Sequence, residues 1–321
     1  MSNPKYSIIV PVYNRPEELG ELLQSLADQT LRNFEVIVVE DGSTLSSEEV
    51  ANEFSDQLTI SYFTKPNTGP GPSRNFGFEK AKGDYFVIFD SDCILPTTYF
   101  ESVDNFLKQQ LVDAWGGPDQ GHEKFTPLQQ AMAYTMSSFF TTGGIRGSKK
   151  GIGNFQPRSY NMGFSRQAYE KTKGFHFDRF AEDIELSIRM KKLGLRVALI
   201  PQAFVFHKRR ATLSQFFRQV YNFGRGRVMV GKQHSGEVKW VHWFPFSFLL
   251  GLILIPVLLL INSKLGFFLL AGYIFYLLLI GLAALFSTKS AVVAFLSIPA
   301  AIVQLVGYGA GFFDEMTKFL R

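Results

Sequence analysis

The feature that most constrains the fold of this chain is its long apolar C-terminal part. Between Trp240 and Phe313 the only formally charged side chains are Lys264 and Lys289. Short polar turns divide this part into three segments, each near the roughly 20 residues that a helix needs to cross a bilayer: 243–261, 266–286 and 291–313. A membrane region with two or three hydrophobic helices is therefore predicted.

The third segment is the least apolar of the three, because Ser297, Pro299 and Gln304 interrupt it. Membrane helices tolerate proline, since neighbouring groups satisfy the backbone atoms that proline frees. The third segment could therefore cross the membrane, enter and leave by one face, or pack along the interface. The sequence leaves these alternatives open.

A basic stretch directly precedes the first apolar segment. From Val205 to Trp240 there are eight lysine or arginine residues and one acidic residue, Glu237. This distribution fits the positive-inside rule and attraction to an anionic leaflet, although a solvated helix face is the simpler alternative. No motif that reads nucleic acid accompanies the charge, so we expect a lipid bilayer and no nucleic acid as a partner.

The residues before the apolar part have the composition of an ordinary globular domain. We place a globular domain at 1–235, which is long enough to bury a core, and the membrane region at 236–321. Cys93 is the only cysteine, and the start MSNPKYSIIVPVYN lacks the long apolar run of a signal peptide. We expect a multi-pass protein of the cell (inner) membrane whose domain at 1–235 lies in the cytoplasm.

Strands and helices alternate in the first 90 residues. Buried strands are predicted at 6–12, 34–40, 58–63 and 84–89, with helices that open at Arg15–Glu18 and span 46–54 and 72–82. This alternation predicts a mostly parallel α/β sheet. Further along, we expect helices near 128–139, 182–193 and 212–230, and short strands at 195–200 and 204–207.

Polar residues follow three of the predicted strands. These are Pro11-Val12-Tyr13-Asn14-Arg15 after the first strand, Glu40-Asp41-Gly42-Ser43 after the second and Asp90-Ser91-Asp92 after the fourth. Ligands of open α/β sheets bind outside the carboxyl ends of the strands. If the strands are neighbours, these loops meet at one edge and form a site.

The pair Asp90 and Asp92 is the most chemically suggestive of these. An extended Asp-x-Asp points both carboxylates to the same side, and Mg²⁺ is usually held by one or two carboxylates together with substrate phosphates. Two solvated turn residues are the alternative for such a short pattern. Its place after a buried strand favours a metal site.

Other candidates each have a structural alternative. Asp41 suits hydrogen bonding to a nucleotide base, but Asp-Gly is also a common turn. The glycine-rich loop 68–75 enters a helix where Arg74 could meet a diphosphate, and it could equally be a turn with a helix cap. It matches neither Gly-x-Gly-x-x-Gly nor a Walker A loop, which argues against a dinucleotide oxidoreductase or an NTPase.

The acidic pair Glu182-Asp183 begins a predicted helix. Acidic residues at such a position are ordinary caps that the helix dipole favours. His207 is likewise explained without function, as a structural histidine. These residues gain a role only from the pattern of the whole chain.

At this point the chain resembles the inverting family 2 glycosyltransferases, which have the Rossmann-like GT-A fold. The resemblance covers roughly residues 6–230, in the order of that family. It rests on SIIVPVYNR (7–15), FEVIVVEDGS (34–43), GPGPSRNFGFEKAKGDYFVIFDSD (69–92), NMGFSR (161–166) and AEDIELSIRMKKLG (181–194). The expected architecture is thus a GT-A catalytic domain followed by an α-helical membrane region.

The resemblance implies a role for each candidate. Asp183 would be the general base, with Glu182 beside it near the acceptor or diphosphate. Asp92 would bind the metal, Mg²⁺ or Mn²⁺, with Asp90 and His207 next to it. The donor would be held by Pro11, Val12, Tyr13, Asn14, Asp41, Arg74 and Asp90. Cys93 would only pack, because a single displacement needs no protein nucleophile.

Arg218 falls near the Gln-x-x-Arg-Trp position of processive polysaccharide synthases, in the acceptor or diphosphate region. Here Gln215-Phe-Phe-Arg218 is followed by Gln219 in place of tryptophan. With only two or three apolar segments, a polymerase that extrudes its product is not expected.

The expected activity is metal-dependent, inverting transfer of a hexosyl or related group from a nucleotide-diphosphate sugar. The acceptor would be a lipid-linked saccharide or another membrane-proximal molecule, in the synthesis of cell-surface polysaccharide or glycolipid. An inactive membrane scaffold that binds nucleotide sugars is one alternative, against which Asp90, Asp92 and Asp183 count. A nucleotidyltransferase is another, against which the Glu-Asp helix and the PVYNR start count.

Overall fold

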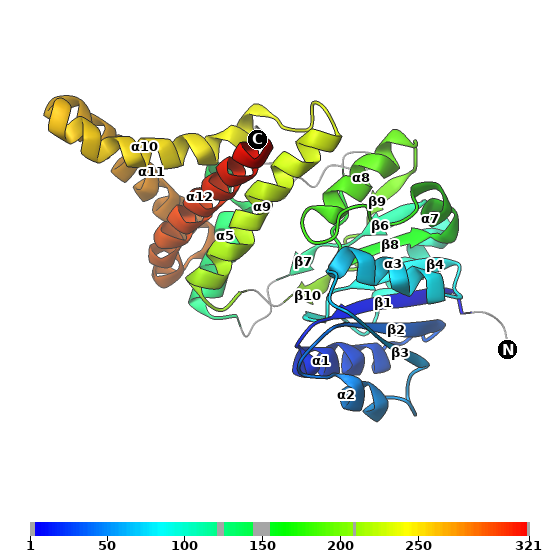
Figure 1. Ribbon diagram of the computed structural model, residues 1–321. Coiled ribbons are helices and arrows are strands. Elements are labelled where there is room, and N and C mark those ends of the chain that lie inside the picture. The colour runs from blue at the N-terminus through cyan, green and yellow to red at the C-terminus, as the bar shows by residue number, and fades with distance from the viewer. Residues whose placement is uncertain (1–3, 121–124, 144–154, 208–209, 320–321) are drawn as a thin grey trace. The chain divides into compact units, whose positions relative to one another are not determined.

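The first strand of the chain, β1 (Tyr6–Val12), lies inside a seven-stranded sheet in the computed structural model, between β2 and β4 (Figure 1). The structure describes residues 4–120, 125–143, 155–207 and 210–319. It forms two compact units, which we call the sheet unit (residues 1–122 and 150–208) and the helical unit (123–149 and 209–321). Each is described by itself.

The main sheet of the sheet unit has the strand order β3-β2-β1-β4-β8-β6-β9. Only β8 runs antiparallel to its neighbours, so the predicted, mostly parallel α/β sheet is confirmed. Its strands are β1 (Tyr6–Val12), β2 (Phe34–Asp41), β3 (Ile60–Lys65), β4 (Tyr85–Phe89), β6 (Ala114–Gly116), β8 (Asn161–Ser165) and β9 (Val197–Leu199).

A second, smaller sheet joins three short strands in the order β5-β10-β7. They are β5 (Cys93–Ile94), β7 (Asp119–Gln120) and β10 (Val205–His207). Strand β10 pairs antiparallel with β5, with His207 opposite Cys93. This pairing joins the end of the sheet unit to the segment that follows β4.

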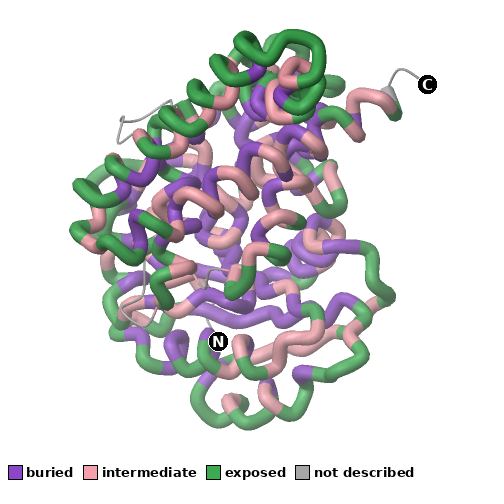
Figure 2. The backbone as a smooth tube through the Cα atoms, turned by 90° about the vertical axis from the view of Figure 1, so that its left-hand side faces the viewer, coloured by how far each residue is buried: buried purple, intermediate pink, exposed green. Residues whose placement is uncertain are grey.

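Helices cover both faces of the main sheet, because its inner strands are apolar on both sides. Ile8 and Val10 of β1 face the core under α1 and α4, whereas Ile9 faces the core under α3, α7 and α8. Figure 2 shows these strands as largely buried. The helices are α1 (Pro16–Ala27), α2 (Glu48–Glu53), α3 (Pro70–Lys80), α4 (Tyr99–Gln109), α7 (Arg166–Thr172) and α8 (Glu182–Lys192).

The helical unit contains the apolar C-terminal part. Its elements are α5 (Pro127–Ser137), α6 (Phe139–Thr142), α9 (Leu213–Gln233), a 3₁₀ helix at Trp240–Trp243, α10 (Phe244–Ile261), α11 (Ser263–Thr288) and α12 (Ala291–Phe319). The described residues include three helices that are long and apolar enough to cross a membrane, α10 with the 3₁₀ turn before it, α11 and α12. The predicted segments are thus three helices, and α12 is one continuous helix despite Ser297, Pro299 and Gln304. The predicted domain boundary after residue 235 stays a prediction.

Candidate functional site

Three parallel strands bring their carboxyl ends to one edge of the sheet, as the sequence predicts. In the order β2-β1-β4 they are direct neighbours, so the loops that follow them lie together. Val12 is buried and Pro11 is half-buried, whereas Tyr13 at the end of β1 is 51% exposed. Tyr13 therefore offers an aromatic face at this edge.

Asn14 ties the loop after β1 to the loop after β2. Its backbone N–H donates to Oγ of Ser43 at 2.8 Å, and its Oδ1 accepts from the backbone N–H groups of Thr44 and Leu45 at 2.8 and 3.0 Å. Asn14 has a positive φ of 53°. Asparagine is among the few residue types that adopt this left-handed conformation readily, so residue type and geometry agree here.

Asp41 at the end of β2 accepts hydrogen bonds from the turn before α3. Its carboxylate accepts from the backbone N–H groups of Thr68 and Gly69 at 2.9 and 2.8 Å, and Lys65 pairs with it. Burial acts to raise the pKa of Asp41, but these donors outweigh it and lower the pKa. Asp41 is therefore ionised and fixes the glycine-rich loop beside the strand end.

Arg74 of α3 joins two candidate carboxylates that are far apart in sequence. Its Nη2 donates to Asp90 at 2.8 Å and its Nη1 donates to Glu182 at 2.9 Å. The Arg74 side chain is only 2% exposed. A buried guanidinium that bridges two acids fixes their separation, so Arg74 connects the loop after β4 to the start of α8.

Glu182 is buried, and its burial raises its pKa to about 7, with the charge of Asp183 adding to the effect and Arg74 opposing it. Its neighbour Asp183 is more accessible and lies 3.6 Å from Nη1 of Arg158. Ala181, just before the pair, has a left-handed φ of 57°. Such strain in a non-glycine residue clusters at functional sites and directs the first turn of α8.

The chain that leads into Ala181 is held by α3. Asn75 exchanges two hydrogen bonds with the backbone of Phe175, at 2.8 and 2.9 Å, and the N–H of Gly71 donates to the carbonyl of Asp178 at 2.9 Å. A Cβ at position 71 would lie 2.1 Å from the carbonyl oxygen of Phe177. The glycine-rich loop therefore permits a close backbone contact that positions the Glu182-Asp183 pair.

Asp92 lies between two cationic or potentially cationic side chains. Arg15 pairs with its Oδ2, and Nε2 of His207 lies 3.1 Å from its Oδ1. The register of β10 on β5 brings His207 to this point, and the Tyr160 ring stacks on the imidazole at 4.8 Å between centroids. The fold thus brings Asp92 and His207 together.

The donor atoms around Asp92 fit a divalent cation. Asp92, Cys93 and His207 each place one potential ligand atom within 4.8 Å of the others. Burial raises the pKa of the Cys93 thiol well above its ordinary value, so without a bound metal the thiol is protonated and is a poorer ligand than Asp92 or His207. A carboxylate and an imidazole remain, a donor set that Mn²⁺ accepts.

The structure adds four residues to the site for which the sequence alone predicts no role. Arg15, Lys65, Asn75 and Arg158 pair with predicted site residues or position them. Arg15 and Asn75 stand inside the motifs that carry the family resemblance, so these motifs could have indicated them. Lys65 and Arg158 stand outside the motifs. Arg218 belongs to α9 of the helical unit, where its side chain is exposed.

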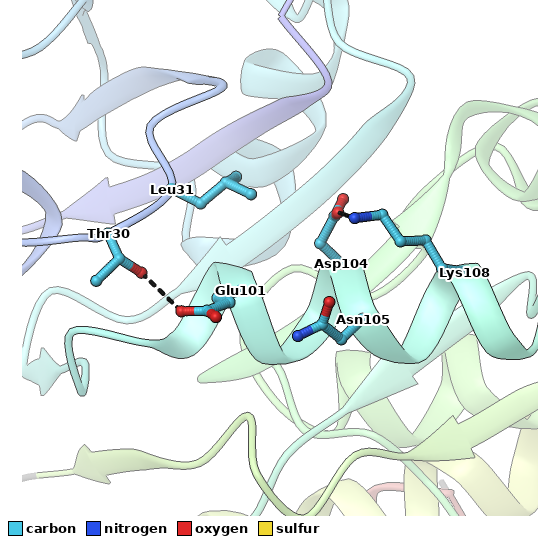
Figure 3. Close-up of a pocket in the computed structure, with 6 residues that line it drawn as sticks. All are labelled: Thr30, Leu31, Glu101, Asp104, Asn105 and Lys108. Carbon is cyan, nitrogen blue, oxygen red and sulfur yellow. Dashed lines mark hydrogen bonds and ion pairs between the residues drawn. The ribbon is translucent and has the colours of Figure 1, made fainter.

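A cavity of about 420 Å³ lies elsewhere in the sheet unit (Figure 3). Thr30 and Glu101, which line it, are joined by a hydrogen bond of 3.2 Å, and Asp104 of α4 pairs with Lys5 just before β1. The cavity is therefore at the amino ends of the strands. It is separate from the candidate site at the carboxyl ends.

Comparison with solved structures supports the fold. Over 95% of this chain and 88% of the other, it resembles the mannosyltransferase PcManGT from Pyrobaculum calidifontis, solved in complex with GDP-Man and Mn²⁺, with a TM-score of 0.63 and 17% identity. The sheet unit thus has a GT-A-like fold, as expected.

Curated relatives match part of the chain. An uncharacterised glycosyltransferase of Haemophilus influenzae is 40% identical over 111 residues, 34% of this chain and 44% of the relative. A poly(ribitol-phosphate) beta-glucosyltransferase of Bacillus spizizenii is 34% identical over 122 residues, 36% of this chain and 19% of the relative. The chain thus spans less than half the length of either. The family model for glycosyl transferase family 2 matches residues 7–173, more than half of the chain, and the chain belongs to that family.

Proposed function

We propose that this glycosyltransferase moves a sugar from a nucleotide-diphosphate donor to a membrane-proximal acceptor, with inversion at the anomeric carbon. The observation that carries the proposal is the Arg74 bridge between Asp90 and Glu182, at 2.8 and 2.9 Å. It places the Asp-x-Asp loop and the Glu-Asp helix start around one buried cation. A donor-side and an acceptor-side carboxylate group are thereby held in fixed relation.

Asp183 is the proposed general base. It lies outside the Arg74 bridge, and its ion pair with Arg158 is a long contact of 3.6 Å. Its carboxylate can therefore accept a proton from an acceptor hydroxyl as that oxygen attacks the anomeric carbon. One displacement of this kind inverts the carbon and uses no protein nucleophile.

The donor is proposed to lie along the carboxyl ends of β1, β2 and β4. Pro11 to Asn14 and Asp41 would form the nucleotide side of the site, and Asp90 would face the ribose or the sugar. Asp92 and His207 would hold Mn²⁺ or Mg²⁺, which supplies positive charge for the leaving diphosphate. Arg74 is buried, so we propose that it acts on the donor by orienting Asp90.

The acceptor is proposed to be a lipid-linked saccharide or another molecule at the membrane surface. The apolar helices support this, because they would keep the enzyme at a bilayer. The partial relationship to a poly(ribitol-phosphate) glucosyltransferase supports a role in cell-surface polysaccharide or glycolipid synthesis. The basic stretch before α10 supports a cytoplasmic catalytic domain at the inner membrane.

The test is a transfer assay with the full chain in lipid nanodiscs, a panel of nucleotide-diphosphate sugars, Mn²⁺ and membrane lipid extract. Release of nucleoside diphosphate together with a glycosylated lipid supports the proposal. Pyrophosphate release would identify a nucleotidyltransferase, and donor binding without product would identify a scaffold. The anomeric configuration of the product, read by NMR, decides between inversion and retention.

The Asp183→Asn variant tests the base. Asparagine preserves shape, so the variant should fold and bind donor while transfer slows at least about a hundredfold, within the range of general base catalysis. Asp178→Asn is the matched control, because it changes an exposed carboxylate nearby and should keep full activity. Near-normal turnover in Asp183→Asn would place the base elsewhere.

A further inference from the structure

The three apolar helices of the helical unit are not equivalent. In its most apolar window, α12 has 44% of its residues buried inside the protein, against 17% for α10 and 17% for α11. Figure 1 shows α10 and α11 running off together as a hairpin, whereas α12 lies alongside α9. Helix α12 is therefore more enclosed by protein than α10 or α11.

Small residues let α12 approach α9 at backbone distance. A Cβ at Gly311 would lie 1.9 Å from the carbonyl oxygen of Tyr221, and a Cβ at Gly224 would lie 2.1 Å from that of Tyr308. One turn before Gly311, a Cβ at Gly307 would lie 2.7 Å from a methyl group of Val220. Ala300 of α12 lies in a buried cluster with Phe216 and Val220 of α9 and Met132 and Met136 of α5.

Charged side chains also pair the end of α12 with α9. Glu315, which is 8% exposed, lies 3.1 Å from Nε of Arg225 and 3.3 Å from Nζ of Lys232. Asp314 accepts a hydrogen bond of 2.7 Å from the hydroxyl of Tyr221. From Ala300 to Glu315, α12 therefore stays at the depth of α9.

Helix α9 cannot lie in the hydrocarbon core of a bilayer. It carries basic side chains along most of its length, Arg218, Arg225, Arg227 and Lys232. A basic side chain is costly at the centre of a membrane helix. A helix with this charge lies at the headgroup level, where an anionic leaflet attracts it.

The start of α10 marks the same level. Trp243 lies 5.0 Å from Phe312 between ring centroids, and Phe246 stacks on Phe313 at 5.5 Å. Trp240 just before it is 92% exposed, and tryptophan is enriched at membrane–water interfaces. The end of α12 therefore returns to the place where α10 enters the membrane.

Helix α11 pairs with α10 as a tight hairpin. The Tyr273 hydroxyl donates to the carbonyl of Phe248 at 2.6 Å, and Gly266 contacts the backbone of Leu259 near the tip. With 18 residues, α10 is about 27 Å long, close to the roughly 30 Å of the hydrocarbon core. The hairpin is long enough to bring its tip near the far side.

We propose that α10 and α11 are the only membrane-inserted pair among these helices, and that α12 lies along the interface on α9. The partner of this surface is a bilayer with anionic headgroups. The exposed Arg218 of α9 faces the headgroups, and the exposed apolar residues of α12, Val292, Phe295 and Phe313, face the acyl chains. The C-terminus then lies on the same side of the membrane as the sheet unit. This inference rests on the membrane residence in the proposed function.

Single cysteines test the arrangement. Cys93 is buried, so the native chain serves as the blank for a membrane-impermeant maleimide. Gln57→Cys reports the sheet unit, Lys264→Cys the hairpin tip and Lys318→Cys the end of α12, and all three positions are exposed. Labelling is compared between right-side-out and inverted membrane vesicles.

We expect Lys318→Cys to react from the same side as Gln57→Cys, and Lys264→Cys to react from the opposite side or not at all. Reaction of Lys318→Cys from the side opposite Gln57→Cys would show that α12 crosses the membrane and would overturn the proposal. Reaction of Lys264→Cys on the Gln57→Cys side would overturn the inserted hairpin.

Two further measurements separate the possible failures. If alkaline washing removes the chain from membranes, membrane residence itself fails, whereas the transfer assay judges the enzymatic activity independently. A green fluorescent protein fused after Arg321 covers the case in which a cysteine variant does not fold. Fluorescence is expected, because the fused protein would stay in the cytoplasm, and its loss at normal protein level contradicts the proposal.

Discussion

Nε2 of His207 lies 3.1 Å from Oδ1 of Asp92, although the two residues come from distant parts of the sequence. The antiparallel pairing of β10 with β5 sets His207 opposite Cys93, the residue after Asp92. An imidazole is therefore fixed beside the proposed metal carboxylate by backbone pairing.

This relationship predicts the effect of removing the imidazole. His207→Ala should raise the Mn²⁺ concentration needed for half-maximal donor binding at least about tenfold. Even residues that only hydrogen-bond to the ligands of a metal change its affinity by about 10–100-fold. Calorimetric titration of donor at several Mn²⁺ concentrations measures this. Tyr160→Phe keeps the stacked ring and is the control. Unchanged Mn²⁺ dependence in His207→Ala would remove His207 from the site.

The Arg74 bridge predicts that substitutions of Arg74 and Glu182 have non-additive effects on the free energy of unfolding. At pH 8.5, above the raised pKa of Glu182, Arg74→Met leaves an ionised Glu182 buried without its partner, and breaking a buried pair in this way costs about 3–5 kcal/mol. Adding Glu182→Gln should recover part of that loss, because it removes the uncompensated charge. Urea unfolding of both single variants and the double variant measures the coupling. Simple additivity would mean that Glu182 is not ionised beside Arg74.

The raised pKa of Glu182 predicts how stability depends on pH. The folded chain holds a proton on Glu182 up to about pH 7, whereas an unfolded glutamate loses it near its ordinary value of 4.5. The folded state therefore binds more protons in this window, and the contribution of Glu182 to stability falls as the pH rises through it. Unfolding midpoints at pH 5 and 7.5 should differ less in Glu182→Gln than in the native chain. The same difference between the two midpoints in Glu182→Gln and in the native chain would contradict the raised pKa of Glu182.

The sequence predicts the central strands well because their signal is local. The runs at β1, β2 and β4 are apolar and β-branched, and Asp41, Asp90 and Asp92 stand directly after them or at their ends. Helices α4 and α7 and strands β6 and β8 were not predicted. Strands β6 and β8 are short, and their place depends on pairing with distant residues such as β4.

The pairings within the site could not be predicted for the same reason. Arg74 meets Glu182, and Arg15 meets Asp92, only once the sheet has formed. The start of α3 at Pro70, two residues before the predicted start, follows from Gly69, whose φ of 106° ends the preceding loop. Proline at either position fits a first turn, so the residue types alone did not decide.

Position 71 gives a test of the loop that supports the Glu-Asp pair. Gly71→Ala would place a methyl group 2.1 Å from the carbonyl oxygen of Phe177, so the backbone must shift and both stability and transfer should fall. Gly20→Ala in α1 is the control. Its nearest contact is 3.3 Å from a Val50 methyl, and alanine gains about 1 kcal/mol over glycine within a helix. The melting temperatures of both variants test this prediction. An unchanged melting temperature in Gly71→Ala would contradict the close contact.

The link between α9 and α12 predicts that two charges can be exchanged. Arg225→Glu brings a third carboxylate to Asp314 and Glu315 and should lower the melting temperature in nanodiscs. Adding Glu315→Arg should restore part of the loss, because the pair is re-formed with reversed polarity. Recovery should be incomplete, since Lys232 also lies 3.3 Å from Glu315. Residues in contact typically couple by about 0.5–3 kcal/mol.

Arg218→Glu is the matched control for this exchange. It makes the same charge change at an exposed position of α9, so Glu315→Arg should not rescue it. If α12 crossed the bilayer, its acidic end would lie on the side opposite α9, and Arg225 could not reach it. Rescue of Arg225→Glu, but not of Arg218→Glu, would therefore require α9 and the end of α12 to share one face of the membrane. If Glu315→Arg has the same effect on both variants, α9 and the end of α12 do not contact each other through Arg225 and Glu315.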